Sequence, residues 1–295
     1  IIDGTKEFHG VKAIKNVNFT LFKGEIHSLL GENGAGKSTM TKVAAGVYQL
    51  SSGSFIYEGK ETTFLTPSEA LKNGVVMVFQ ENSLVPNMTV SQNIYLGAEN
   101  FFNSLAKLNI KASRFLQSLN FNVDPNLLVS QLGAAQKQMV EIARAVHHNA
   151  KVIIFDEPTA TLTPEEKHHF FGLMQRLKKE GVSIVFISHA LEEALEHSDR
   201  ITVLRDGELI ETDTARKFNR ERIVKAMIGR DLTDSAYASK KTTTKKPRKR
   251  GKKTLEVENL SMGSMVKNST FSAYSGQITG VFGLVGSGRT EMMKV

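Results

Sequence analysis

Residues 31–38, Gly-Glu-Asn-Gly-Ala-Gly-Lys-Ser, have the composition and spacing of a phosphate-binding loop, G-x-x-x-x-G-K-[ST]. Glycines let successive backbone N–H groups curl around phosphate oxygens, and the helix that follows offers its unpaired N–H groups to the same anion. Lys37 would reach the β- and γ-phosphates of a nucleotide, and the Ser38 hydroxyl would ligate magnesium. The apolar run Ile26–Leu30 predicts the strand that this motif requires, which favours it over a glycine-rich turn with a chance lysine.

Two adjacent carboxylates follow another apolar run, Val152–Phe155. Because open α/β sheets bind ligands at the carboxyl ends of their strands, we expect Asp156 and Glu157 to face the phosphate loop. Asp156 would hold magnesium through water, and Glu157 would be the general base for the attacking water. The alternative is a pair of solvated carboxylates after a core strand.

The region around the phosphate loop has a near-copy later in the chain. Asn16–Thr39 aligns with Asn268–Glu291 at a constant offset of 252 residues, and Arg289 stands where the first copy has Lys37. Two homologous domains in tandem follow from this repeat. Because about 40 residues cannot bury a core alone, we expect the chain to be a fragment of something longer. The second phosphate-loop positions are Gly283, Gly288, Arg289 and Thr290.

The elements that must position these residues are short β-branched runs alternating with amphipathic helices. The strand candidates are Ile26–Leu30, Val75–Phe79, Val152–Phe155, Ser183–Ile187 and Ile201–Arg205. Capping boxes open helices at Thr66 and Thr163. This alternation predicts an α/β fold with a mostly parallel sheet covered on both sides. Residues before Gly24 and around 55–63 predict a small antiparallel β flank.

Composition restricts the class of protein. Hydrophobic residues make up 40% and charged residues 23% of the chain, as in globular proteins, and no cysteine is present to form disulfides. Residues 240–253 hold nine Lys/Arg and no acid, and the remainder carries 29 basic against 30 acidic residues. The net charge of +8 therefore lies in one segment, which predicts a solvated linker. A contact with anionic lipid or nucleic acid is the alternative for that segment.

With these motifs in place, the chain resembles the nucleotide-binding subunit of an ABC transporter. The resemblance implies that Gln80 senses the γ-phosphate and contacts the membrane subunit, and that His189 contacts the γ-phosphate. Phe8 matches the aromatic residue that stacks on adenine. Thr159–Thr163 matches the family's D-loop, with Leu162-Thr163 where Leu-Asp is usual. The alternatives are a structural histidine at a strand end and a core phenylalanine.

Taken together, the motifs and the resemblance imply an ATP site with magnesium. The catalytic residues would be Glu157, His189 and Gln80. The ATP contacts would be Phe8, Gly31, Asn33, Gly34, Ala35, Gly36, Lys37, Ser38 and Thr39. The metal ligands would be Ser38, Gln80 and Asp156.

The family's signature, Leu-Ser-Gly-Gly-Gln, is altered in this chain. Its five positions are Leu132, Gly133, Ala134, Ala135 and Gln136. Gly133 lacks the serine hydroxyl, and Ala135 places a methyl where glycine lets the backbone approach phosphate. In the family this segment closes over the ATP of the partner domain, so it would face the loop that carries Arg289. Both departures from the family pattern therefore fall in one composite site.

The resemblance also implies a domain plan. Residues 1–233 would form the first ABC ATPase domain, a P-loop NTPase α/β fold with a helical subdomain at about 82–150. Residues 234–254 would be the basic linker, and 255–295 the truncated start of a second ABC domain. The tandem arrangement and the segment Gln80–Gly97 resemble the fused ATPases of bacterial monosaccharide importers of the ribose, galactose and xylose type.

The first functional hypothesis is an ATPase that powers such an importer at the cytoplasmic face of the membrane. Its partners would be integral-membrane permease subunits, through them a periplasmic or extracellular solute-binding protein, and a second ATPase half in the same chain; no nucleic acid is expected. The alternative is a tandem ABC ATPase without a membrane partner, such as a ribosome-acting translation factor. Such proteins usually keep intact signatures and a long helical linker, whereas this linker is short and contains Pro247 and Gly251.

Overall fold

The structure is a computed structural model that describes residues 1–79, 83–97, 104–148, 150–229, 251–263, 266–282 and 287–294. The chain divides into two compact units, Ile1–Asp231 and Leu232–Val295. Gln80, Gly283 and most of the expected linker lie outside the described residues.

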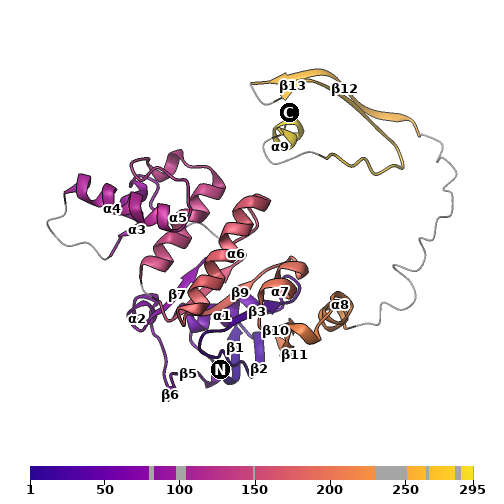
Figure 1. Ribbon diagram of the computed structural model, residues 1–295. Helices are drawn as coiled ribbons and strands as arrows, with labels where there is room; N and C mark the ends of the chain where they lie inside the picture. The colour runs from indigo at the N-terminus through magenta and orange to yellow at the C-terminus, as the bar shows by residue number, and fades with distance from the viewer. Residues whose placement is uncertain are drawn as a thin grey trace. The chain divides into compact units, whose positions relative to one another are not determined.

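A six-stranded sheet forms the centre of the first unit, with strand order β11-β10-β3-β9-β8-β7 (Figure 1). Strands β3, β7, β8, β9 and β10 run parallel, and β11 pairs antiparallel with β10. The mostly parallel sheet predicted from the sequence is confirmed. The bounds are β3 Ile26–Leu30, β7 Val75–Val78, β8 Val152–Asp156, β9 Ser183–Ile187, β10 Arg200–Arg205 and β11 Glu208–Thr214.

The predicted antiparallel flank is also confirmed. β1 (Ile2–Phe8) pairs with β2 (Val11–Val17) and with β4 (Ser52–Ser54), and a small hairpin joins β5 (Ile56–Tyr57) to β6 (Lys60–Glu61). The flank lies at the end of the unit that holds the N-terminus (Figure 1).

Helices follow the strands and cover the sheet. The bounds in the first unit are α1 Lys37–Ala44, α2 Pro67–Lys72, α3 Val90–Ile94, α4 Leu105–Ser118, α5 Ala134–His147, α6 Pro164–Lys179, α7 Leu191–His197 and α8 Arg220–Ile228, with 3-10 turns at Val129–Gln131 and Ala215–Lys217. The expected caps are present: the Thr66 side chain accepts from Glu69 N–H, and Thr163 forms a reciprocal capping box with Glu166. Helices α3, α4 and α5 gather to one side of the sheet (Figure 1).

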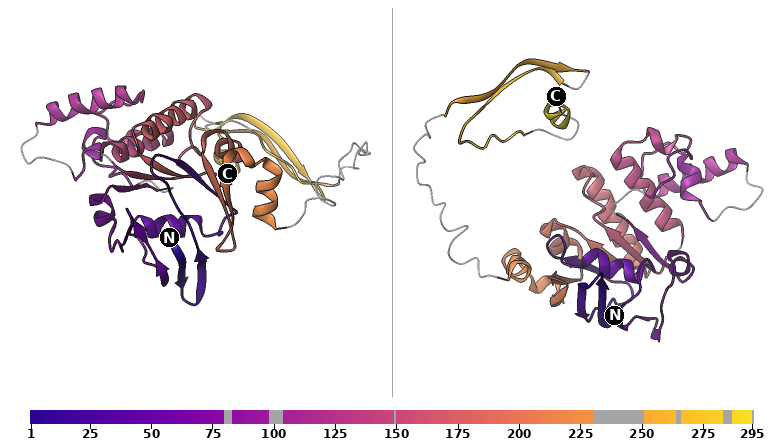
Figure 2. Two further views of the ribbon diagram at one scale, coloured as in Figure 1. Left: turned by 60° about the horizontal axis from the view of Figure 1, so that its bottom comes forward. Right: turned by 180° about the vertical axis from the view of Figure 1, so that it is seen from behind.

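Successive side chains of a strand point to opposite faces of a sheet, and the central strands carry apolar side chains on both faces. Ile153 and Phe155 of β8 pack with α5 and α6, where Phe170 is 1% exposed. Ile154, between them in the chain, packs on the other face with Met40 of α1. The sheet is thus covered by α5 and α6 on one face and by α1 with the antiparallel flank on the other (Figure 2), which explains why its strands read as continuous apolar runs.

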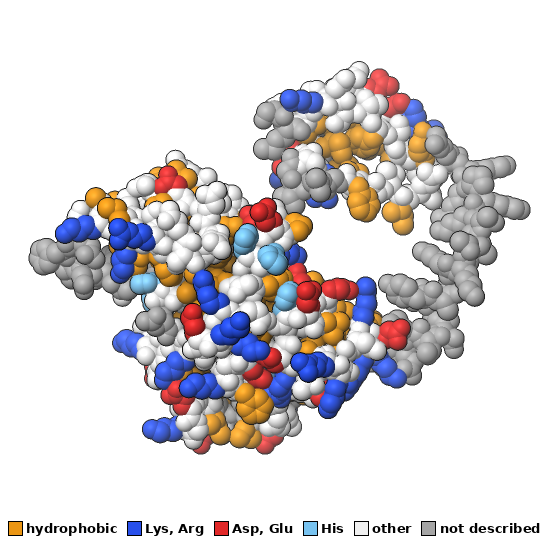
Figure 3. All heavy atoms as spheres, viewed as in Figure 1, with side chains coloured by type: hydrophobic (Ala, Val, Ile, Leu, Met, Phe, Trp, Pro, Cys, Tyr) orange, Lys and Arg blue, Asp and Glu red, His pale blue; other side chains and the backbone are white. Residues whose placement is uncertain are grey.

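Charged side chains are mixed on the surface of the first unit. On the face seen in Figure 3, basic and acidic side chains of that unit lie among one another. Within the described ranges, no helix is long and apolar enough to cross a bilayer.

The second unit contains a long hairpin and a short helix. β12 (Lys253–Met262) pairs antiparallel with β13 (Val266–Tyr274), and α9 spans Arg289–Met293. Backbone conformations match at equivalent positions of the repeat. Asn16 and Asn268 have φ of 45° and 49°, and the glycines that open α1 and α9, Gly36 and Gly288, have φ of 99° and 78°.

A buried histidine lies in β3, the strand that leads into the phosphate loop. His27 of β3 is fully buried, with Nε2 2.7 Å from Thr202 Oγ1 and Nδ1 3.3 Å from Glu25 Oε1. Burial lowers the pKa of His27 from its ordinary 6.5, against the opposing effect of Glu25, while Arg200 also lowers it. The folded state therefore takes up this proton less readily than the unfolded chain does.

We expect this histidine to make the protein acid-sensitive. Below about pH 6.5 the unfolded state binds the proton first, so the contribution of neutral His27 to stability is complete above that pH and lost as the pH falls. Thermal melts at pH 7.5 and 5.5 should show a smaller loss of melting temperature in His27→Gln than in the wild type. The exposed His169→Gln serves as control, and an unchanged pH dependence in His27→Gln would contradict the prediction.

Candidate active site

Strand register brings the predicted site residues to one edge of the sheet. β9 lies between β3 and β8, and its Ile187 is aligned with Leu29 on one side and with Asp156 on the other. The residues at the carboxyl ends of these three strands therefore emerge side by side. They are the phosphate loop, Asp156-Glu157 and His189.

The phosphate loop is folded tightly against its surroundings. Gly36 has φ of 99°, and a Cβ there would lie 2.6 Å from Ala13 O. A Cβ on Gly31 would lie 2.4 Å from Leu204 O. A Cβ at either position would clash with a backbone oxygen, so the fold of the loop requires glycine at both. Asn33 and Gly34 are exposed at the turn of the loop, Ala35 is buried, and Thr39 is half-buried on α1.

Lys37 is held inside the loop. Its side chain is 5% exposed, and Nζ donates hydrogen bonds to Gly31 O at 2.8 Å and Glu32 O at 3.0 Å. Burial lowers the pKa of Lys37, and the carboxylates of Glu157 and Asp156 partly offset that effect. The ammonium group is therefore preorganised where phosphate oxygens would meet the loop.

Asp156 and Ser38 form a donor set suited to a hard cation. Asp156 is 3% exposed and hydrogen-bonds with Ser38, and its Oδ1 has no hydrogen-bond partner among the residues that the structure describes. Burial raises the pKa of this carboxyl group, which the Ser38 hydrogen bond opposes. A buried carboxylate oxygen left unpaired beside a hydroxyl group is what a magnesium ion would satisfy, so these residues fit that metal.

Glu157 and His189 are in direct contact. His189 Nε2 lies 2.5 Å from Glu157 Oε1, and the two side chains are 45% and 15% exposed. Glu157 has φ of 53°, a left-handed conformation that is uncommon outside glycine. Its backbone N–H donates to Ile187 O at 3.1 Å. Strained backbone of this kind clusters at functional sites.

Comparisons with known proteins agree with this geometry. Residues 14–160 match the ABC transporter family. The structure resembles a crystal structure of the ADP conformation of an ATP-binding cassette of an ABC transporter, with a TM-score of 0.67 and 27% identity over 78% of this chain and 97% of the other. The chain carries an ABC transporter ATP-binding domain.

Relatives of the whole chain are import ATP-binding proteins. The galactose/methyl galactoside import ATP-binding protein MglA 1 of Photobacterium profundum is 43% identical over 98% of this chain and 58% of its own length. The ribose import ATP-binding protein RbsA of a Chelativorans species is 41% identical over 97% and 55%, respectively. The chain thus spans little more than half the length of these curated relatives.

Phe8 stands at the end of β1 in the ABC domain. It is half-buried, and its ring packs edge-to-face with Tyr48 at a centroid distance of 5.0 Å. Lys6 Nζ lies 5.0 Å from the ring centroid. Among the described residues, Phe8 belongs to none of the three buried apolar clusters of the domain.

The altered signature lies at the start of α5. Leu132 is buried, Gly133 is the N-cap residue, and Ala134 begins the helix; both Gly133 and Ala134 are exposed. Gly133 N–H donates to Gln136 Oε1 at 3.2 Å. Ala135 is half-buried in the first turn. The helix N-terminus therefore presents its backbone to the outside of the domain, where another domain could meet it.

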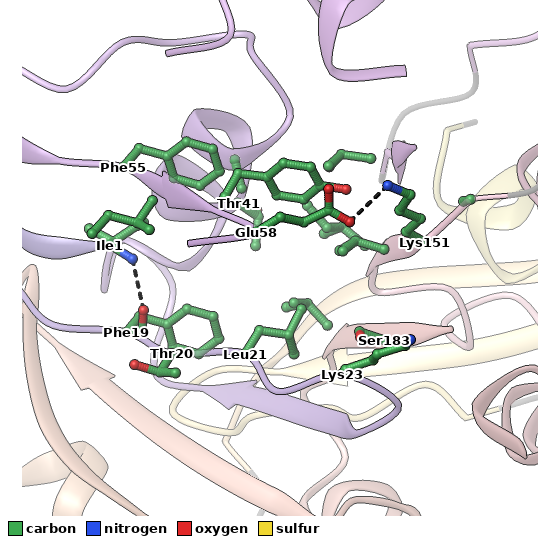
Figure 4. A pocket seen from close by; sticks show the side chains of 18 of the residues that line it. Ile1, Phe19, Thr20, Leu21, Lys23, Thr41, Phe55, Glu58, Lys151 and Ser183 are labelled. Carbon is green, nitrogen blue, oxygen red and sulfur yellow. Dashed lines mark hydrogen bonds and ion pairs between the residues drawn. The ribbon is translucent and has the colours of Figure 1, made fainter. Parts of the chain in front are cut away.

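A cavity of about 890 Å³ lies away from this site in the ABC domain. The first residues of β7, β8 and β9 line it, so it is at the amino end of the sheet, opposite the phosphate loop. Lys151 and Glu58 form a 2.7 Å ion pair at its wall, and the Ile1 amino group donates to Phe19 O (Figure 4). Its walls are largely apolar, and it holds none of the predicted site residues.

Sequence reasoning missed one residue at the edge of the ATP site, Glu193 of α7. It accepts hydrogen bonds from side chains close to both Glu157 and His189 in the chain. Its position four residues after His189 was the available signal, but its partners are set by the tertiary structure.

Proposed function

We propose that this chain belongs to the ATP-binding and hydrolysing subunit of a membrane importer for a monosaccharide or a related small polar solute. The observation that carries the proposal is the meeting of Lys37, the Ser38–Asp156 pair and the Glu157–His189 pair at one sheet edge. Relatives at 41–43% identity that are import ATP-binding proteins for galactose, ribose and xylose support the solute class.

The chemistry follows from the side chains. Lys37 Nζ would exchange its two carbonyl acceptors for phosphate oxygens of ATP, and the loop N–H groups would bind the same phosphates. Ser38 and Asp156, with Gln80, would hold magnesium, which supplies further neutralisation of phosphate charge. Glu157 Oε1 would take the proton of the attacking water, and His189 would orient that carboxylate and contact the γ-phosphate.

The partners follow from the same proposal. ATP binding would draw two ATPase domains together, and hydrolysis would release them. Permease subunits at the cytoplasmic face of the membrane would convert that motion into a change of access, with Gln80 at the contact, and a solute-binding protein would deliver the cargo to them.

We also propose the tandem domain plan, with residues 1–233 as the first domain, 234–254 as linker and 255–295 as the start of a second domain. Exposure supports it: Ile26 and Leu30 of β3 are fully buried, whereas their equivalents Ile278 and Phe282 are 103% and 97% exposed. In the first domain, β3 pairs with β10 on one side and with β9 on the other. The second copy would need equivalent strands from a longer chain.

The basic run at 240–253 favours a second candidate, a tandem ABC ATPase without a membrane partner. Co-purification from detergent-solubilised membranes separates the two. Recovery of the complete protein with permease subunits supports the importer, whereas recovery with ribosomes supports the alternative.

Binding of ATP to this chain tests the site itself. Lys37→Ala removes a charged donor to the phosphates, and hydrogen bonds to charged groups contribute about 1.5–3 kcal/mol. We expect the dissociation constant for Mg·ATP to rise roughly 10- to 100-fold by calorimetry. Lys72→Ala, an exposed lysine on α2, is the control. Equal affinity in wild type and Lys37→Ala would reject the proposed site.

A further inference from the structure

Glu193 joins three separate segments of the domain through one carboxylate. Its Oε2 accepts hydrogen bonds from Thr159 Oγ1 and Ser188 Oγ, each at 2.8 Å. Its Oε1 accepts from Lys167 Nζ of α6 at 2.7 Å. The Glu193 side chain is 12% exposed, so these contacts are largely shielded from water.

Each of the two hydroxyl donors is close in the chain to one member of the Glu157–His189 pair. Thr159 lies two residues after Glu157, and Ser188 directly precedes His189. Both donors are 4% exposed. The hydrogen bonds to Glu193 Oε2 therefore link the loop after β8 to the loop after β9. These are the loops that carry Glu157 and His189, whose side chains are in contact.

The hydrogen bonds to Glu193 stabilise a segment in which the backbone of Glu157 has an unfavourable conformation. Glu157 has a left-handed φ of 53°, and such conformations persist only where the surrounding structure holds them. A backbone hydrogen bond from Glu157 N–H to Ile187 O joins the start of the loop after β8 to the end of β9. The hydrogen bonds from Thr159 and Ser188 to Glu193 form a second connection between these two segments.

Glu193 is itself held in place. The next residue, Ala194, is fully buried in the cluster that contains Leu30 and Val203. Partial burial raises the pKa of Glu193, but the hydrogen bonds from Lys167, Thr159 and Ser188 outweigh it, and the net pKa is lowered. The group therefore stays a carboxylate, which accepts all three hydrogen bonds at once.

We propose that Glu193 is a positioning residue for ATP hydrolysis, which holds the loops of Glu157 and His189 in register so that the two side chains meet the attacking water correctly. The inference rests on the proposed ATPase function. Glu193 acts through Thr159 and Ser188 and does not itself touch the nucleotide.

Glu193→Gln in the complete protein tests this role. The amide keeps the shape but offers one acceptor oxygen instead of two, and it loses the charge that pairs with Lys167. Because small misplacements of reacting groups cost up to about 10²-fold in rate, we expect kcat for ATP to fall roughly 10- to 100-fold. The KM for ATP and the melting temperature should stay near wild type.

Three variants sharpen the test. Glu192→Gln, an exposed acid one residue earlier on α7, should leave kcat unchanged. Thr159→Val removes one donor at constant shape and should give a smaller loss of kcat. Its effect and that of Glu193→Gln should combine to less than the sum of the two single losses, because both changes act on the same hydrogen-bond network. If Glu193→Gln does not fold, Thr159→Val and Ser188→Ala together carry the test.

The outcomes separate this inference from the proposed function. If Glu157→Gln is inactive while Glu193→Gln, or the double variant, keeps wild-type kcat, the positioning role is wrong and the ATPase proposal stands. Parallel losses of kcat, ATP affinity and melting temperature would reduce Glu193 to a structural role and overturn the inference. If Glu157→Gln stays active, the general base lies elsewhere, whereas a wild-type complete protein that does not hydrolyse ATP would reject the ATPase proposal itself.

Discussion

Replacing Glu157 with glutamine should lower ATP turnover of the complete protein by roughly 10²–10⁴-fold, the usual cost of losing a positioned general base. The amide keeps the volume of the carboxylate but cannot accept the proton of the attacking water. ATP binding should remain, because Lys37 and the phosphate loop carry it. The protein should accumulate in the closed, ATP-bound state.

Steady-state and single-turnover hydrolysis, with ATP affinity measured on the same preparations, check this prediction. Glu165→Gln is the matched control, because it changes an exposed acid at the start of α6. A Glu157→Gln protein that keeps at least half of wild-type turnover would place the base elsewhere.

The second large effect is an asymmetry between the two phosphate loops. In the complete protein, Lys37→Ala should abolish turnover, whereas Arg289→Ala should leave much of it. Lys37 is a compact ammonium aimed into its loop, whereas the planar guanidinium of Arg289 does not replace it atom for atom. The signature expected to face Arg289 is altered at Gly133 and Ala135. Losing one preorganised donor to developing charge costs about 10²–10³-fold, so two departures should leave that composite site slow.

This asymmetry also predicts how the present chain behaves. It should bind ATP but hydrolyse it barely above background at any concentration, because the signature that would complete the Lys37 site is expected in the second domain. Steady-state ATPase assays of the two alanine variants decide the matter. If Arg289→Ala is as damaging as Lys37→Ala, both loops share the chemistry.

Local sequence determined the parts of the site that depend on local geometry. The phosphate loop was predictable because Gly31 and Gly36 take conformations and close contacts that exclude a Cβ. The strands were predictable because burial on both faces requires apolar runs. Asp156 at the end of such a run was predictable for the same reason.

The tertiary structure decided what depends on contacts between distant segments. The order β3-β9-β8 brings the phosphate loop, Glu157 and His189 together, and no local pattern encodes which strand lies between which. The left-handed backbone of Glu157 and its 2.5 Å contact with His189 are outcomes of that packing. Glu193 gains its partners only there, because Thr159 is 34 residues away in the chain. A carboxylate on an amphipathic helix normally faces solvent, and only the fold supplies the three donors that make its burial favourable.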